Sequence, residues 1–258
     1  LSGDGGDELF CGYNRYLNGY DLYKSSQFKP LKYLLNNFKL KSFLNNFSNE
    51  LIIEKYEKFM SVLNTDNIYD YYSNVVKIFD DKDYIFKDKN LENNLQLFPD
   101  FPDAYKYKEE DVLMYLDMRQ YLPEDIMTKV DRASMSCGLE TRAPFLDHEL
   151  VEYSFSIPLS MKKNKNKGKQ VIRQILYKNL PKFLVDNNKK GFSVPVSDWL
   201  DGPLKEWSNN LLENEINNKD SLFNKERLKL LISKDNNESR KSQKIWTLLM
   251  FLSWKENF

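Results

Sequence analysis

The first eight residues of this chain hold its densest group of side chains that could do chemistry. They read Leu-Ser-Gly-Asp-Gly-Gly-Asp-Glu, so the carboxylates of Asp4, Asp7 and Glu8 are interspersed with glycines. Glycines let successive backbone N–H groups converge on an anion, and a helix N-terminus adds partial positive charge. Three carboxylates would repel a bare phosphate, so the segment favours a nucleotide carried with Mg²⁺, or a cationic or amine reactant. The structural alternative is a glycine-rich turn before an acid-capped helix, and the pattern matches neither a Walker A loop nor G-x-G-x-x-G.

A lysine-rich loop supplies the second group. A fixed cation beside a phosphate stabilises the negative charge that accumulates when a carboxylate attacks it. Most lysines are solvated at the surface, so residue type alone does not separate Lys169 from its neighbours. The lysines of this loop are Lys162, Lys163, Lys165, Lys167 and Lys169.

Helices must position both groups, because helical periodicity dominates the chain. Residues 1–6 read as the end of a strand and its turn, and Asp7 opens an acidic first helical turn. A segment from Glu109 to Tyr121 repeats at the helical period. Pro123 predicts the start of a separate helix, and Gly138 predicts its end.

Two further helices are expected towards the C-terminus. Asp147 is a predicted N-cap for a helix that ends at Ile157. A last helix is expected at about Ser242 to Lys255, and its apolar residues predict that it is buried against the rest of the chain. Those apolar residues are Ile245, Leu248, Leu249, Leu252 and Trp254.

Several other polar side chains are candidates for structural or chemical roles. Asp131 and Arg132 fall within the helix after Pro123, where an Asp–Arg pair most often links helices by a bidentate bond. Arg142 either braces the site or meets a substrate carboxylate. His148, the single histidine, is expected to face solvent, and Cys11 to be a small buried side chain rather than a nucleophile.

Composition excludes several classes of protein. The 258 residues carry 38 Lys and Arg against 38 Asp and Glu, which argues against a nucleic-acid partner chosen by charge. No apolar run approaches 18 residues, so no membrane span is expected. Two cysteines without metal-ligand spacing favour a reducing, cytoplasmic setting. The chain begins at Leu1 without a signal-peptide pattern, which indicates an internal fragment.

Five segments resemble, in order, the motifs of glutamine-hydrolysing asparagine synthetases. Residues 1–13 are similar to that family's S-G-E/D-G-x-D-E-x-F-x-G-Y segment, and residues 121–135 to its Y-L-P-x-D-x-L-x-K-x-D-R-x-x-M stretch. Residues 140–147 resemble E-x-R-x-P-F-L-D, 168–173 resemble G-K-x-x-L-R, and 190–195 resemble K-x-G-F-x-x-P. Together these motifs are highly specific, whereas residues 20–107 and the tail after about 208 match only loosely.

The resemblance implies a two-step reaction. ATP and Mg²⁺ would convert aspartate to an aspartyl-adenylate with release of pyrophosphate, and ammonia from a glutaminase domain would then displace AMP to give asparagine. A homodimer is expected for the full-length protein, and composition already favours a cytoplasmic enzyme without a nucleic-acid or membrane partner.

Residue roles follow by position. Ser2 and Gly3 would contact the adenylate, Gly5 would belong to the nucleotide loop, and Asp7 would be the acid linked to Mg²⁺ and pyrophosphate. Asp4 stands where the family often has Glu, which handles the incoming ammonia, and its shorter side chain places the carboxylate closer to the backbone. The remaining catalytic candidates are Lys169, which matches the family's catalytic lysine, and Arg142.

The implied fold class is mainly α, as the helical C-terminal part of an α/β adenine-nucleotide α-hydrolase-like (PP-loop ATP pyrophosphatase) synthetase domain. Residues 1–258 would form one partial synthetase domain. Its parts are a nucleotide- and acyl-site loop and helix (1–19), a helical segment (20–107), motif-bearing helices and loops (108–200) and C-terminal helices (201–258).

Two departures and two alternatives accompany this interpretation. The chain contains neither an N-terminal catalytic cysteine for glutaminase chemistry nor an S-G-G-x-D-S pyrophosphate loop, so the isolated chain is expected to be inactive. One alternative is amide transfer to another carboxylate, such as a sugar acid of a surface polysaccharide. The other is a catalytically dead helical interaction module.

Overall fold

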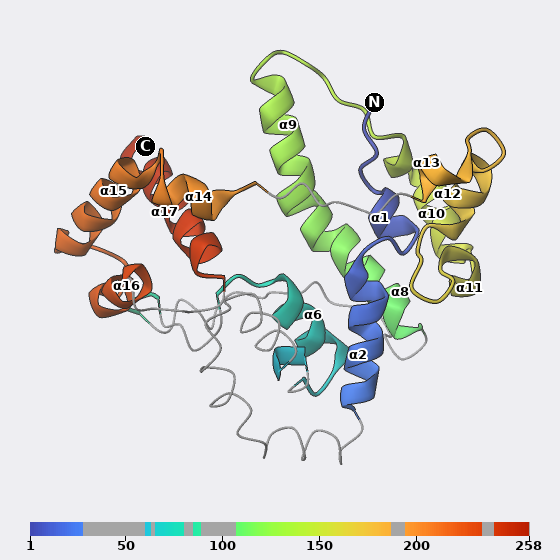
Figure 1. The fold of residues 1–258 in the computed structure, drawn as a ribbon, viewed down its shortest axis with the longest axis horizontal. Coiled ribbons are helices and arrows are strands. Elements are labelled where there is room, and N and C mark those ends of the chain that lie inside the picture. The colour runs from blue at the N-terminus through green and yellow to red at the C-terminus, as the bar shows by residue number, and fades with distance from the viewer. Residues whose placement is uncertain are drawn as a thin grey trace. The chain divides into compact units, whose positions relative to one another are not determined.

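The computed structural model describes residues 1–27, 60–62, 65–79, 85–88, 107–186, 194–233 and 240–257. Every regular element in these ranges is a helix (Figure 1). The only β-type pairings among them are two isolated bridges, Phe86 with Phe223 and Asn164 with Lys167. The expected mainly α character is confirmed for the described residues. Most of the segment at 20–107 and of the motif at 190–195 lies outside them.

The chain divides into two compact units. Unit one comprises residues 1–33, 62–72 and 96–189, and unit two comprises residues 34–61, 73–95 and 190–258. Every candidate catalytic or ligand-binding residue lies in unit one. The site can therefore be described within that unit alone.

Unit one is built from short helices around a longer helical run (Figure 1). Leu9, Phe10 and Ile157 form a buried apolar cluster beneath the N-terminal loop, so the loop rests on packed side chains. The elements of the unit, in chain order, are α1 (Gly6–Leu9), η1 (Asn14–Tyr16), α2 (Asn18–Ser26), the first half of α6 (Ile68–Val76), α8 (Glu109–Leu116), η3 (Asp117–Met127), α9 (Thr128–Met135), η4 (Pro144–Leu146), α10 (His148–Ser156), α11 (Leu159–Lys162), α12 (Gln170–Leu176) and α13 (Lys182–Val185).

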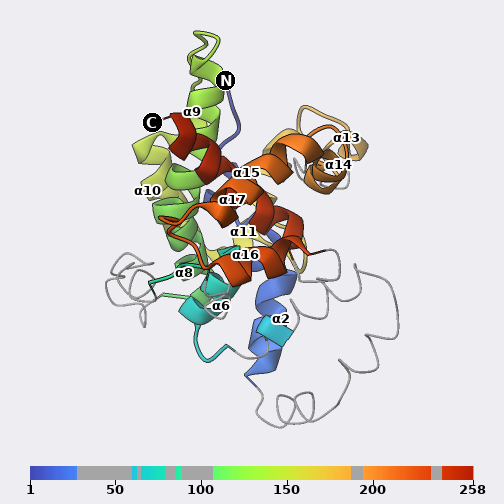
Figure 2. The ribbon, with the colours of Figure 1, turned by 90° about the vertical axis from the view of Figure 1, so that its left-hand side faces the viewer.

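Unit two is a small helical cluster. It contains α14 (Val196–Asp201), α15 (Lys205–Asn217), α16 (Lys225–Ile232) and α17 (Lys241–Asn257), which lie together in orange to red in Figure 1 and Figure 2. The expected last helix is confirmed, because Leu249 and its apolar neighbours on α17 are buried in the core of this unit. Trp254 is an exception. Its side chain is 56% exposed and rests against Phe251, so its predicted burial is wrong.

The sequence predicted that a separate helix starts at Pro123, and this prediction is wrong. Helices α8, η3 and α9 follow one another without a break, and Pro123 lies inside the π-helical η3. Proline has no backbone N–H and clashes with the carbonyl four residues before it, and a wider π turn relieves the clash. The carbonyl of Pro123 itself accepts a 2.8 Å hydrogen bond from the Thr128 hydroxyl. The predicted end is confirmed, since Gly138 has φ 69° just after α9.

Asp117 is the centre of a buried polar network in unit one. Its carboxylate is fully buried and accepts hydrogen bonds from Arg15 Nε at 2.6 Å, from the Tyr72 hydroxyl at 2.8 Å, and from the Tyr16 hydroxyl. The Arg15 guanidinium also lies 3.9 Å from the centre of the Tyr13 ring. The network joins η1, α6 and η3, so it fixes the segment that follows the N-terminal loop.

Asp117→Asn is expected to lower the free energy of unfolding by about 3 kcal/mol or more, because it leaves the largely buried Arg15 charge without its counter-charge. Urea denaturation followed by circular dichroism measures this. The matched control is Lys129→Ala, which breaks the exposed 2.7 Å pair between Lys129 and Asp125 and should cost about 0.5 kcal/mol or less. Equal losses in the two variants would show that Asp117 does not have this structural role.

Candidate functional site

The N-terminal loop is held by the segment at 140–147. Gly5 has φ 87°, and a Cβ there would lie 2.4 Å from Leu146 Cδ2, so η4 packs directly on the loop. The backbone N–H of Ser2 donates to the carbonyl of Arg142 at 2.8 Å. A residue with a side chain would be strained at position 5 and would push η4 away. Two of the five sequence motifs therefore meet at this point.

The motif at 168–173, which contains Lys169, also lies very close to the N-terminal loop. A Cβ at Gly168 would lie 1.8 Å from the carbonyl oxygen of Cys11, and a Cβ at Gly12 would lie 2.5 Å from Lys169 Cε. The Lys169 N–H donates to the carbonyl of Phe10 at 2.8 Å. Only glycine allows the two backbones to come this close.

The close approach places Lys169 beside Asp7. Lys169 Nζ lies 2.9 Å from Asp7 Oδ2, and both side chains are partly exposed, at 30% and 22%. Lys169 has φ 57°, an uncommon conformation for a residue with a side chain, and α12 begins directly after it. The structure thus brings together Asp7 and Lys169, which are far apart in the sequence.

Two polar atoms of the loop have no partner. Ser2 Oγ and Asp4 Oδ2 are both buried, and neither makes a hydrogen bond. Buried polar groups are rarely left unpaired, because each unmade hydrogen bond costs free energy. These two atoms therefore mark a place where a polar ligand would be bound.

Glu8, the third acid of the loop, belongs to the packed interior instead. It is 1% exposed and accepts a 2.7 Å hydrogen bond from the Tyr13 hydroxyl. Burial raises the pKa of Glu8, and it also raises the pKa of Tyr13. Asp4 and Asp7 are thus the acids of this loop that are not fully buried.

Arg142 contributes its carbonyl rather than its side chain to the loop. Its guanidinium is exposed and pairs with the exposed Glu140 at 2.6 Å. Asp131 and Arg132 are both exposed, and within the described residues no ion pair joins them. Among the described residues the predicted Asp–Arg link between helices is not present, and α9, which carries both residues, has no buried residue.

The segment around His148 matches its prediction. The Asp147 carboxylate accepts hydrogen bonds from the backbone N–H groups of Glu149 and Leu150 at 3.1 and 3.3 Å, which caps α10. His148 is exposed at the first position of that helix. A structural cap and a solvated histidine account for this segment.

Cys11 is fully buried and has φ 58°. Burial raises the pKa of its thiol to about 12. The predicted small buried side chain is confirmed, and its left-handed backbone explains why a glycine would suit the position equally well.

No group of three or more His, Cys, Asp or Glu side chains within the described ranges could hold a metal ion by itself. Mg²⁺ is commonly held by one or two carboxylates together with substrate phosphates, so Asp7 fits a cation that arrives with a nucleotide. In the same described ranges, every helix falls short of the length and hydrophobicity that a bilayer crossing requires.

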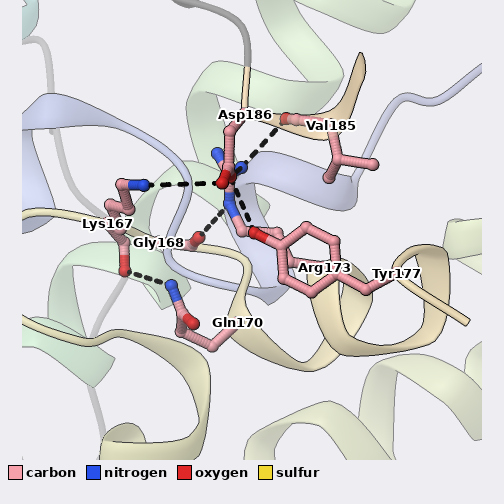
Figure 3. A network of polar contacts seen from close by, with 7 residues as sticks. All are labelled: Lys167, Gly168, Gln170, Arg173, Tyr177, Val185 and Asp186. Carbon is pink, nitrogen blue, oxygen red and sulfur yellow. Dashed lines mark hydrogen bonds and ion pairs between the residues drawn. The ribbon is translucent and has the colours of Figure 1, made fainter. Parts of the chain in front are cut away.

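Asp186 and Tyr177 also lie near the site, although no motif of the sequence includes them. Asp186 accepts hydrogen bonds from Arg173 Nη1 and from the Tyr177 hydroxyl (Figure 3). Arg173 Nε in turn donates to the carbonyl of Gly168 at 3.1 Å. Both residues lie outside the five motifs, so no local pattern pointed to them.

Comparison with known proteins identifies the class. The family model for asparagine synthase matches residues 1–256. The chain therefore belongs to the asparagine synthase family. No solved structure matches it significantly.

Individual relatives carry related names. The chain is 28% identical, over 98% of its length, to asparagine synthetase [glutamine-hydrolyzing] 1 of Bacillus subtilis, and it spans 39% of that relative. Over 34% of its length it is 35% identical to asparagine synthetase [glutamine-hydrolyzing] 3 of the same organism, covering 16% of that protein. Over 35% of its length it is 29% identical to amidase chry2 of Gibberella zeae, covering 14% of it.

Gly168→Ala is expected to lower the free energy of unfolding by about 1–3 kcal/mol, because its Cβ would collide with the Cys11 carbonyl. Thermal or urea unfolding measures the loss. Gly3→Ala is the matched control, since a Cβ at Gly3 meets nothing within 4 Å and should change stability by about 0.5 kcal/mol or less. If Gly168→Ala were as stable as Gly3→Ala, the two backbones would not approach so closely.

The two thiols are expected to react at very different rates. At pH 8, Cys11 is buried and protonated, because the pH lies far below its pKa of about 12, whereas Cys137 is exposed. Iodoacetamide should alkylate Cys137 within minutes and leave Cys11 unmodified until urea unfolds the chain. Mass spectrometry of the digested protein measures both sites. Equal labelling in the folded state would contradict the burial of Cys11.

Proposed function

We propose that this chain forms the acyl-activating part of an asparagine synthetase. In this proposal ATP and Mg²⁺ activate aspartate as aspartyl-adenylate, and ammonia then gives asparagine with AMP. The chain spans 39% of the first relative, so we propose that a longer protein carries out the whole reaction. A glutaminase domain would supply the ammonia in that protein, which we expect to be cytoplasmic and homodimeric.

One observation carries the proposal. Lys169 Nζ lies 2.9 Å from the Asp7 carboxylate, beside a glycine-rich loop in which Ser2 Oγ and Asp4 Oδ2 are buried without partners. A fixed cation, a partly exposed carboxylate and unpaired polar atoms together suit a phosphate-bearing substrate with an attacking carboxylate.

Each residue then has a defined role. Ser2 and Gly3 would bind the acyl-adenylate, with Ser2 Oγ supplying a hydrogen bond, and Gly5 would keep the loop open to the nucleotide. Lys169 would stabilise the charge on the α-phosphate oxygens as the aspartate carboxylate attacks. Mg²⁺, when bound through Asp7, would neutralise charge on the departing pyrophosphate.

Asp4 would act in the second step. Ammonium must lose a proton before or while its nitrogen attacks the acyl carbon, and a carboxylate at the loop can attract the cation and accept that proton. The unpaired Asp4 Oδ2 supports this role. Arg142 would hold the loop through its carbonyl, which accepts from the Ser2 N–H.

Lys169→Met is expected to reduce aspartate-dependent ATP–pyrophosphate exchange by about 10²–10³-fold, because the lysine stabilises charge that develops in the transition state. The assay uses the complete protein, radiolabelled pyrophosphate and saturating Mg²⁺. Lys165→Met is the matched control, since Lys165 is exposed in the same loop, and it should retain full exchange. Full exchange by Lys169→Met would contradict the proposed role.

The same assay distinguishes the acceptor. Aspartate should support exchange, and sugar acids such as glucuronate and galacturonate should not. Exchange with a sugar acid alone would favour amide transfer to another carboxylate, and no exchange with any acid would favour a non-catalytic module. The isolated 258-residue chain is expected to make no asparagine from aspartate, ATP and ammonia.

A further inference from the structure

Polar side chains from α12 and from the residues that flank it surround Asp186 (Figure 3). Asp186 Oδ1 accepts from Arg173 Nη1 at 2.8 Å and from the Tyr177 hydroxyl at 2.7 Å. Lys167 Nζ lies 3.7 Å from the other carboxylate oxygen. Arg173 Nη1 also donates to the Val185 carbonyl at 3.0 Å, which joins α12 to the end of α13.

Arg173 connects this cluster to the backbone that carries Lys169. Its Nε donates to the Gly168 carbonyl at 3.1 Å, and its backbone N–H donates to the Lys169 carbonyl at 2.9 Å. On the opposite side, the same turn is pressed against the backbone of Cys11. The peptide between Gly168 and Lys169 is therefore held from two sides.

Lys169 needs such support. Its φ of 57° lies in the left-handed region, which is strained for a residue with a side chain, so surrounding contacts must maintain it. A guanidinium held by a carboxylate at a fixed angle can provide that support, because its planar fork fixes direction as well as distance. Asp186 and Tyr177 fix the angle of the Arg173 fork.

Asp186 is ionised at neutral pH. The hydrogen bond from Tyr177, together with the nearby charges of Lys167 and Arg173, holds the pKa of Asp186 below its ordinary value. The carboxylate is thus available as a constant counter-charge for Arg173.

We infer that Asp186, assisted by Tyr177, is a positioning residue that acts through Arg173 and Gly168 to hold the Lys169 ammonium beside Asp7. The inference rests on the proposed function, because it assigns to this cluster the task of placing the catalytic lysine. A small displacement of a catalytic group can cost on the order of 10²-fold in rate, so the effect on catalysis should exceed the effect on stability. The side chains of Arg173 and Asp186 are partly exposed, at 23% and 30%, and exposed pairs stabilise little.

The test is a double-mutant cycle in ATP–pyrophosphate exchange with the complete protein. Asp186→Asn and Tyr177→Phe should each lower kcat for exchange by about tenfold or more, with KM for aspartate changed less than about twofold. In the Lys169→Met background, Asp186→Asn should cause no further loss, because the cluster acts through Lys169. Asp220→Asn, at an exposed aspartate of unit two, is the matched control and should leave kcat unchanged.

Two results would overturn the inference. One is an unchanged kcat in Asp186→Asn. The other is an equal fractional loss with and without Lys169, which would indicate a general structural effect. Thermal unfolding of Asp186→Asn and Asp220→Asn should agree within about 2 °C.

If the wild-type protein shows no exchange at all, that result contradicts the proposed function alone. The positioning role is then tested by backbone amide resonances. Backbone amide resonances of Gly168, Lys169 and Gly12 should shift in Asp186→Asn and in Tyr177→Phe, and stay in place in Asp220→Asn. Amide resonances of Gly168 and Lys169 that do not move in Asp186→Asn would overturn the positioning role, whatever reaction the protein catalyses.

Discussion

The site depends on one close contact, between the backbone of Gly168 and the backbone of Cys11 and Gly12. A Cβ at Gly168 would fall 1.8 Å from the Cys11 carbonyl oxygen, so the contact requires glycine. The 2.8 Å hydrogen bond from the Lys169 N–H to the Phe10 carbonyl holds the two segments in register. Because the contact is made by backbone atoms, it fixes where the Lys169 side chain begins, and the Asp7 carboxylate lies within reach.

The first segment of that contact is anchored by the buried network around Asp117. Arg15 follows the contact by a few residues, and its pairing with Asp117 at 2.6 Å ties η1 to η3. The unbroken course of η3 through Pro123 is part of the same arrangement, since η3 carries Asp117 at its start. The desolvation cost of a buried ion pair offsets much of its attraction, whereas removing one partner leaves an unpaired charge and is strongly destabilising. The network therefore holds η1, which follows the N-terminal loop, in place against η3.

Local patterns predicted local features, and contacts between distant segments escaped them. The Asp147 cap, the turn at Gly138 and the last helix follow from rules that act over a few residues, and the structure has all three. The predicted start of a new helix at Pro123 is wrong, because a π turn accommodates a proline inside a continuous helix. The pairing of Lys169 with Asp7 and the contacts of Asp186 join segments that no periodicity relates.

The charges of the loop resolve an apparent conflict in its sequence. Three acids beside a proposed nucleotide site would repel phosphate, yet Glu8 is buried and hydrogen-bonded to Tyr13, and Asp7 is neutralised by Lys169 at 2.9 Å. Of the three acids, Asp4 alone has a buried oxygen without a hydrogen-bond partner. In the proposed reaction, Asp4 is the acid assigned to the incoming ammonium ion, which a negative charge attracts. An acid-rich loop is therefore compatible with an anionic nucleotide, because Glu8 is turned into the packed interior and Asp7 is paired with a lysine.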